Sequence, residues 1–270
     1  MENDCLVTKL KGVVNNNNLL KLGEFIIHVN ATSSGKDREF TWVAGQVGYV
    51  RTLDGSNKIK FIRSAGAFTN YVEIPAGTYN HTIIFDSGEY DIAIGNMYNV
   101  RTCNPYTKDG LAFSANLNRL AEYSKGLFEI GAGETALYLN LDNFAKNAGT
   151  SLGIVNNLNG PGFITGSIES LADKPNLTQL FVNNSAGVTG SIEKLLEAHI
   201  KVLGRTSGYL HLELGKTSAT LNNITALSLN RSTFYTKFSD TGCTIDDNSS
   251  DSATILASYN KSTNVWTYNL

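Results

Sequence analysis

The sequence has few charged residues, few prolines and few methionines. Only 17% of its 270 residues are charged, with 22 Lys and Arg against 24 Asp and Glu, for a net charge of -2. Nucleic-acid binding normally requires a basic surface that follows the phosphates, so this balance excludes that class of partner. Four prolines leave no proline-rich linker, and two methionines leave no Met-lined adaptable groove.

The three cysteines are odd in number and lie far apart, at Cys5, Cys103 and Cys243. They form no C-x-x-C pair, which excludes a zinc knuckle, and an odd count disfavours a disulfide framework. The start of the chain has two early acids and no apolar signal-peptide core, and no window has the roughly 18 apolar residues of a membrane span. We therefore expect no signal peptide, no membrane insertion and maturation in a reducing cytoplasm.

What is abundant is Asn, Ser, Thr and Gly, beside 41% hydrophobic residues. This composition favours turns and short strands, and predicts a mainly β fold. Residues 1–105 contain short alternating runs separated by turn residues and no helical periodicity, which predicts an N-terminal antiparallel β domain, a sandwich or small barrel. The runs that we expect to be strands are 25–29, 40–44, 58–62 and 82–85, with turns at 53–57 and 75–77.

A repeat marks the middle zone, 106–229. The sequence ITGSIE at 164–169 recurs as VTGSIE at 188–193, a period of 24 residues. Between the two copies, Leu177, Leu180 and Val182 have the L-x-x-L-x-L spacing of a leucine-rich-repeat strand. We expect a short leucine-rich-repeat-like solenoid, in which Thr-Gly-Ser-Ile is the bend that leaves the strand. Chance duplication of six residues is the alternative.

Degenerate coils of this solenoid are expected around the two clear copies, at 136–141, 152–157, 209–214 and 224–229. The last zone, 230–270, returns to strand-like alternation. Runs at 253–259 and 265–270 flank a polar turn at 260–264, which predicts a β-hairpin that caps the solenoid.

Two sequence patterns that are known from enzymes occur in unsuitable surroundings. Residues 149–153 match G-x-S-x-G, and Asp173 and His199 follow in the order of a hydrolase triad, but a nucleophile elbow needs a strand-to-helix turn in a large parallel sheet. Residues 131–136 match G-x-G-x-x-A, yet the following residues alternate like a strand instead of opening a helix. A glycine-bounded turn and a link between two strands are the preferred interpretations.

Metal ligation and acid catalysis also find little support. The four histidines, at 28, 81, 199 and 211, show no paired ligand spacing. Residues 246–251 have the oxygen density of a calcium loop but lack its glycine and its closing glutamate, so a solvated loop is preferred. Glu169 and Glu193 recur at the array period, which favours a structural role over paired catalytic acids. We expect no catalytic residue, no cofactor and no metal.

The start of the chain carries a resemblance to a known group of proteins. Residues 5–14 read CLVTKLKGVV, followed by four asparagines at 15–18 that favour a turn. This segment, and the T-G-S-I repeats further on, resemble proteins from Bacteroides and from the crAss-like phages that infect them. In that group a CLVTKLKG-type start precedes a small β domain and a leucine-rich-repeat-like array with T/S-G-D/S-I repeats.

The resemblance implies a non-enzymatic virion structural protein, a capsid head fibre or decoration protein, that is assembled in the host cytoplasm. Its partners would be other capsid or tail proteins, with a homo-oligomer, dimer or trimer, as the expected state. The segment 1–24, with Leu6, Leu10, Leu19 and Leu22, would dock the protein; a plain strand pair of the first domain is the alternative for this segment.

The array would face outward, with Gln179 and Phe181 on its surface and a host-surface glycan as a further candidate ligand. Two other function classes stay open: a bacterial repeat-bearing adhesion or carbohydrate-binding module, and a polysaccharide hydrolase.

Overall fold

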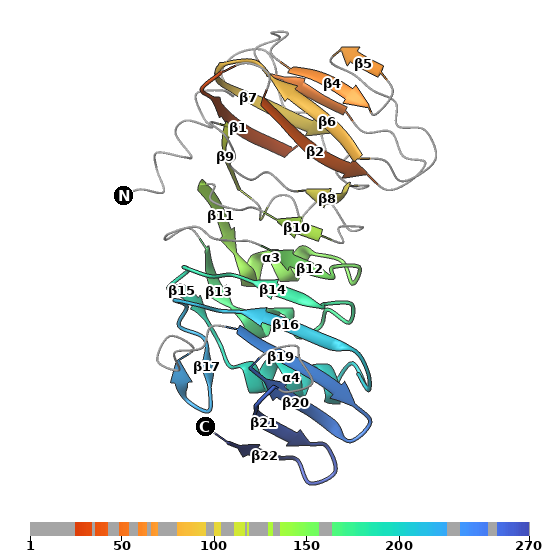
Figure 1. Ribbon diagram of the computed structural model, residues 1–270, viewed down its shortest axis with the longest axis vertical. Helices are drawn as coiled ribbons and strands as arrows, with labels where there is room; N and C mark the ends of the chain where they lie inside the picture. Colours follow the sequence, from red (N-terminus) through yellow and green to blue (C-terminus); the bar gives the residue numbers. More distant parts are fainter. Residues whose placement is uncertain are drawn as a thin grey trace.

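The computed structural model is mainly β, as the composition predicts. It describes residues 25–33, 36–42, 49–53, 59–63, 66–69, 80–95, 100–103, 111–116, 118, 129–131, 136–156, 164–225, 233–247 and 253–269. Figure 1 shows an elongated molecule in which the strands before β9 gather at one end and the strands β19 to β22 at the other.

Two long sheets contain nearly all of the described strands. The first sheet has the order β15 (Gly187–Thr189), β13 (Ile164–Ser167), β11 (Ala136–Asn140), β9 (Leu111–Asn116), β1 (Phe25–Ala31), β7 (Gly88–Gly95) and β3 (Tyr49–Thr52). The second has the order β22 (Val265–Tyr268), β21 (Ile255–Asn260), β20 (Gly242–Asp246), β19 (Thr233–Ser239), β16 (Tyr209–Glu213), β14 (Gln179–Phe181), β12 (Ile154–Asn156), β10 (Glu129–Gly131), β8 (Val100–Cys103), β2 (Lys36–Trp42), β6 (Asn80–Phe85), β4 (Ile59–Arg63) and β5 (Gly66–Thr69).

The first zone is antiparallel. The expected strands at 25–29, 40–44, 58–62 and 82–85 correspond to β1, β2, β4 and β6, with shifted ends. In β1, Ile27, Val29 and Ala31 are buried and alternate with His28 and Asn30, the two-residue period of a half-buried strand. Both sheets continue past residue 105 into the next zone. In the first sheet β9 pairs with both β1 and β11, and in the second sheet β8 pairs with β10.

From β8 and β9 onward the strands pair in parallel in both sheets. The chain passes from a strand of the second sheet to a strand of the first, and then through a helical segment back to the second sheet. Buried Ile164 and Val188 come from the first sheet and buried Leu180 and Leu212 from the second, in one continuous core. The helical segments are α3 (Leu141–Asn147), η2 (Ile168–Leu171) and α4 (Ile192–Lys201).

The Thr-Gly-Ser motif is not the bend that leaves the leucine strand, and that expectation is wrong. Thr165 to Ser167 end strand β13 of the other sheet, and Ser167 and Ser191 are the N-caps of η2 and α4. Their hydroxyls accept the backbone N–H of Glu169 and Lys194 respectively, which supplies a partner for an otherwise unpaired donor of the first turn. The motif is therefore a strand end joined to a helix start.

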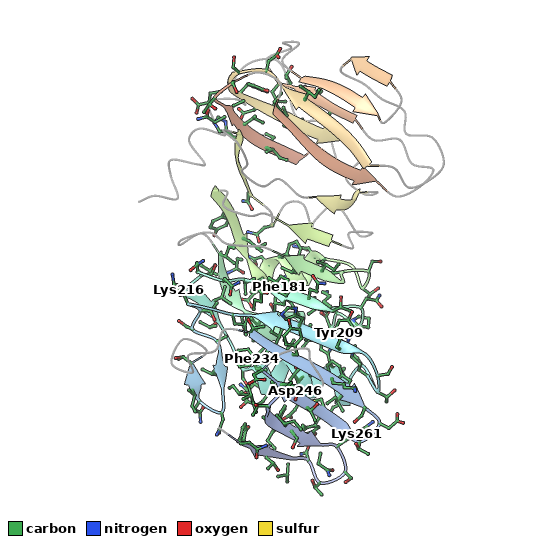
Figure 2. The ribbon with its side chains drawn as sticks, viewed as in Figure 1. Phe181, Tyr209, Lys216, Phe234, Asp246 and Lys261 are labelled. Atoms are coloured by element: carbon green, nitrogen blue, oxygen red, sulfur yellow. The ribbon has the colours of Figure 1, made fainter. Side chains whose placement is uncertain are left out.

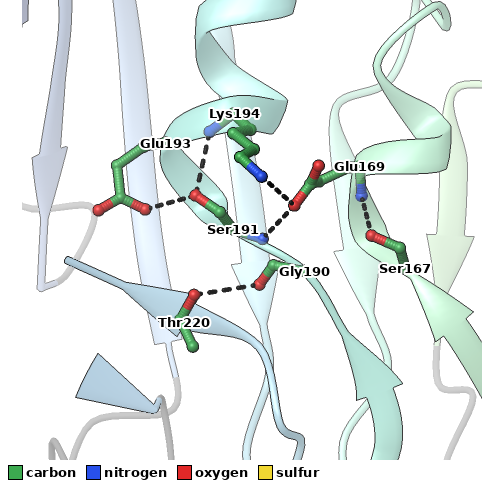
Figure 3. Close-up of polar contacts among 7 residues, drawn as sticks. All are labelled: Ser167, Glu169, Gly190, Ser191, Glu193, Lys194 and Thr220. Carbon is green, nitrogen blue, oxygen red and sulfur yellow. Dashed lines mark hydrogen bonds and ion pairs between the residues drawn. The ribbon is translucent and has the colours of Figure 1, made fainter. Parts of the chain in front are cut away.

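The acid two residues after each cap binds the backbone of a later segment, and Figure 3 shows this contact for Glu169 and Ser191. Asp142 accepts the N–H of Ser167 at 3.2 Å, and Glu169 accepts the N–H of Ser191 at 2.9 Å. Glu193 in turn accepts the N–H of Asn222. The first member, capped by Asn140, has no Thr-Gly-Ser motif, which is why the sequence pattern shows only two copies.

The parallel array ends at β16, because β16 pairs antiparallel with β19. The prediction of a solenoid coil at 224–229 is wrong for residues 224 and 225, the part that the structure describes. β18 (Ile224–Thr225) pairs antiparallel with β17 (Thr220–Leu221) in a separate two-stranded sheet. Asn222 and Asn223 have φ values of 51° and 62°, the left-handed conformation of a tight hairpin turn that asparagine tolerates. Residues 226–229 lie outside the described residues.

Candidate functional site

A patch of aromatic and polar side chains covers the exposed face of the second sheet over β14, β16, β19 and β20. Because side chains alternate along a strand, burial of Leu180, Leu210 and Leu212 turns their neighbours to the opposite face. We call this patch the outer face. It consists of Gln179, Phe181, Tyr209, His211, Glu213, Thr233, Tyr235, Lys237, Thr244 and Asp246.

The register of the strands places four of these residues in one row across the sheet. Gln179 lies opposite His211, His211 opposite Tyr235, and Tyr235 opposite Asp246. Parallel rows run beside it, such as Tyr209, Lys237 and Thr244. Directly opposed residues have Cβ atoms within about 5.5 Å, so the members of each row are neighbours in space.

Three rings pack together in the middle of the outer face. The His211 and Tyr235 rings are stacked, with centroids 4.0 Å apart and planes 21° apart. Phe181 meets His211 edge to face, with centroids 4.5 Å apart and planes 71° apart. Such contacts stabilise beyond the area they bury and limit the rotamers of the rings. The three rings therefore form a rigid cluster carried by three neighbouring strands.

Hydrogen bonds to the loop after β14 hold the acidic side of the cluster. The Asn183 side-chain amide donates to Glu213 at 2.9 Å, and its oxygen accepts the N–H of Gly215 at 2.7 Å. Asn184 follows with a left-handed φ of 58°, which turns the chain at this point. Glu213 Oε1 lies 3.7 Å from His211 Nε2, so the carboxylate stands beside the ring cluster in a defined orientation.

Burial shifts two titratable groups of the central row towards their neutral forms. Burial lowers the pKa of His211, and the nearby Glu213 opposes this shift only in part. Burial, and then the negative charge of Asp247, raise the pKa of Asp246. The imidazole of His211 is therefore neutral at pH 7, and the middle of the outer face carries little positive charge.

The outer face combines ring surface with hydrogen-bonding groups of several kinds. Tyr209 is 61% exposed, and Lys237 is exposed beside it. The Arg205 guanidinium donates to the Tyr209 carbonyl at 2.6 Å and so anchors the start of β16. Amide, carboxylate, hydroxyl and ammonium groups around aromatic rings offer stacking and polar contacts to a ligand that has both an apolar and a polar side.

The two residues expected on the array surface, Gln179 and Phe181, both belong to the outer face. The four leucines of the proposed docking segment, Leu6, Leu10, Leu19 and Leu22, lie outside the described residues. Sequence reasoning missed His211, Tyr235 and Asp246 as their neighbours. The alternation at 209–214 was visible, but only the register between distant strands brings Tyr235 and Asp246 beside it.

The hydrolase-like residues do not form the hydrogen bonds of a triad: His199 contacts Leu171 and Arg205 instead. Residues 149–153 form a turn in which Ser151 is exposed, in agreement with the glycine-bounded turn. His199 is fully buried, with its Nε2 atom directed at the Leu171 carbonyl. The Asp173 side chain is 72% exposed and pairs with Lys174. The G-x-G-x-x-A pattern joins the end of β10 to the start of β11, with 132–135 outside the described residues.

The described residues contain no group of three or more His, Cys, Asp and Glu side chains that could hold a metal ion. His28 instead bridges two carboxylates, with Nδ1 2.8 Å from Asp91 and Nε2 2.9 Å from Glu89. Cys243 is a buried free thiol, and burial raises its pKa to about 12. The side chains of His81 and Cys103, the whole of Cys5, and residues 248–251 of the acidic loop lie outside the description.

No protein-family model, curated protein or solved structure matches the chain. Within the described part of the chain, no helix has both the length and the apolar character needed to cross a membrane.

Proposed function

We propose that the protein is a non-enzymatic virion structural protein, a capsid head fibre or decoration protein, which docks through its N-terminal region and displays the array outward. The observation that supports the display role is the outer face. In Figure 2, Phe181, Tyr209 and Asp246 of this face lie in the half of the molecule away from the N-terminal strands. An elongated body with a polar and aromatic surface far from its first strands suits attachment at one end and contact at the other.

We further propose that the parallel strands form a short leucine-rich-repeat-like solenoid closed by the last strands. Two features support this: the parallel strands recur in both sheets, and the carboxylates of Asp142 and Glu169 each bind the backbone of the next turn, while that of Glu193 binds the hairpin that follows. β19 to β22 pair as antiparallel strands after the array, and in this proposal β21 and β22 serve as the hairpin cap.

A host-surface glycan is the ligand class that the outer face fits best. A sugar ring has an apolar C–H face, which packs on aromatic rings, and a rim of hydroxyls, which pair with amides and carboxylates. Phe181, Tyr209 and Tyr235 supply the rings, and Gln179 and Glu213 supply amide and carboxylate groups.

A bacterial repeat-bearing adhesion or carbohydrate-binding module is the second candidate. The same outer face favours it, because glycan contact at this surface requires no particle. The two candidates differ in where the protein is found. The virion protein is expected with capsid or tail proteins, and the adhesion module is expected on a cell surface.

Glycan binding is tested by applying the full chain to an array of bacterial surface polysaccharides. We expect Tyr209→Ala and Phe181→Ala to weaken binding at least tenfold, the loss of about 1.4 kcal/mol that one ring contact supplies. Val202→Ala is the matched control, because Val202 is 77% exposed and lies outside the outer face. Unchanged binding by both aromatic variants, with normal thermal melts, would reject this surface.

The virion assignment is tested by mass spectrometry of density-purified particles from the source culture. Peptides of this chain that co-purify with capsid proteins after protease treatment support the virion protein. Their recovery only in the bacterial envelope fraction rejects it and supports the adhesion module.

A further inference from the structure

We propose that the edge strand β22 pairs with β22 of a second copy of this chain, forming a two-fold dimer with one continuous sheet across the interface. This inference does not depend on the virion role or on glycan binding.

β22 is the last strand of the second sheet, and the described residues leave its outer edge uncovered. The corresponding edge of the first sheet, at β15, is covered instead. There the N–H groups of Ser218 and Thr220 donate to the carbonyls of Val188 and Gly190, each at 2.8 Å. Among the described residues, the two sheets therefore differ at this end of the molecule: the edge of β15 is paired within the chain, and the edge of β22 is open.

The hydrogen-bond register shows which groups point outward from β22. The Asn269 N–H donates to the Leu256 carbonyl at 2.8 Å, so 269 and 256 form a hydrogen-bonded pair. Such pairs alternate along an antiparallel ladder, which makes Thr267 and Val265 the next residues bonded to β21. The backbone N–H and C=O groups of Trp266 and Tyr268 consequently point to the open edge.

β22 lacks three of the devices that normally protect an edge strand from pairing with another molecule. Its sequence, Val-Trp-Thr-Tyr, has no charge and no proline, and its pairing with β21 has no bulge. All four residue types favour strands. Val265 is 54% exposed and Thr267 is also exposed, so both are available on the outer side of the strand.

The strand is also held rigid in a conformation ready to pair. The Trp266 indole donates to Glu197 on α4 at 2.8 Å, and the Tyr268 hydroxyl donates to Glu193 on the same helix at 3.1 Å. Both rings pack against the core. Pairing would therefore require little ordering of the chain, which is the usual entropic cost of β-addition.

A second copy fits this edge because the edge is self-complementary. A two-fold axis through Trp266 places Trp266 opposite its own copy, where both N–H and both C=O groups face across the interface. It also places Val265 of one copy directly opposite Thr267 of the other, on the same face of the sheet. No charged side chain of β22 meets its own copy, so self-pairing produces no like-charge repulsion.

The resulting dimer is joined end to end, because β22 lies at the end of the molecule opposite the N-terminal strands (Figure 1). The N-terminal strands of the two copies would then lie at opposite ends of a particle about twice as long as the monomer. The contact is short, which places it in the class of small interfaces with dissociation constants in the micromolar range.

Sedimentation velocity from about 1 to 200 µM, a range set by that interface class, tests the proposal with the full chain. We expect the wild type to approach twice the 29.2 kDa chain mass as concentration rises, and X-ray scattering to show a doubled maximum dimension. V265K/T267K places lysines opposite each other across the axis and should remain monomeric. V265E/T267K places Glu opposite Lys and should restore the dimer, a recovery that only this register predicts.

T150K/T206K is the control, because it adds two lysines at exposed positions away from β21 and β22 and should associate like the wild type. All substituted positions are exposed, so thermal melts should be unchanged. A wild type that stays monomeric throughout would overturn the proposal. Association of V265K/T267K would overturn it as well, and so would failure of V265E/T267K to recover the dimer.

Discussion

Removal of the Glu169 carboxylate is the sharpest test of how successive turns of the array are held together. Glu169 accepts the Ser191 N–H at 2.9 Å in a partly buried setting, and Lys194 lies 3.8 Å from the same oxygen. A hydrogen bond to a charged acceptor contributes about 1.5–3 kcal/mol, whereas an exposed ion pair contributes about 0–1 kcal/mol. The Lys194 side chain is 72% exposed, so the backbone hydrogen bond is the larger contribution.

We therefore expect Glu169→Ala to lower the free energy of unfolding by about 2 kcal/mol, since the Ser191 N–H loses its acceptor. Glu169→Gln keeps an acceptor of the same length and should cost about 1 kcal/mol or less. Lys194→Ala should cost less than about 0.5 kcal/mol. For a chain of this size, a loss of 2 kcal/mol corresponds to a fall in Tm of about 4–8 °C.

Urea unfolding followed by circular dichroism measures these differences. Asp240→Ala is the matched control, because Asp240 is an exposed acid on the turn after β19. A double-mutant cycle of Glu169→Ala with Lys194→Ala separates the two contacts and should show weak coupling. If Glu169→Ala and Glu169→Gln are equally stable, or if Glu169→Ala costs no more than Lys194→Ala, the carboxylate does not link the turns as argued.

Two further predictions concern backbone strain and pH. Gly242→Ala should destabilise the protein by at least about 3 kcal/mol, because φ is 146° and a Cβ atom would overlap the Tyr259 carbonyl. Gly204→Ala is the control: its φ is 66° with open space around it, so it should cost about 1 kcal/mol. Equal melting temperatures for the two variants would contradict the argument from strain and overlap. Burial, and then the charge of Arg205, lower the pKa of His199 from 6.5 to about 4, so its neutral form stabilises the fold fully above pH 6.5 and less as the pH falls towards 4. Between pH 7.5 and 5 the wild type should lose about 2 kcal/mol through this group, and His199→Gln should show a flatter pH profile in thermal melts; parallel profiles would refute the assignment.

The sequence predicted the local elements of the array well where one strand or one repeat carried its own signal. The alternation in 209–214 and the spacing of Leu177, Leu180 and Val182 depend only on near neighbours, and both segments contain strands with buried leucines. Thr-Gly-Ser-Ile-Glu was recognised as a repeat but misread as a bend, because Gly166 and Gly190 suggest a turn. Their left-handed φ values of 96° and 109° occur instead where a strand passes into a helix cap.

The candidate site illustrates what sequence could not supply. Gln179 and Phe181 were predicted on the array surface, but His211, Tyr235 and Asp246 join them only through register. A shift of one residue in that register would turn Tyr235 to the buried face. The choice between registers is made by packing of the buried leucines against the other sheet, a contact between residues far apart in the chain.

By itself, the sequence determined the mainly β class, the approximate position of many strands, the 24-residue repeat and the neutral polar surface, because composition and short-range periodicity express local preferences. Only the tertiary structure decided that two sheets run through both zones, that Asp142 continues the series of Glu169 and Glu193, and that residues 220–225 form a separate hairpin. It also decided that Trp266 and Tyr268 bind α4 and that β22 is the end strand of the second sheet among the described strands. Apart from the local hairpin, these features depend on hydrogen bonds between distant segments, such as Glu169 with Ser191 and Tyr268 with Glu193, and such pairings follow from the packing of the whole core.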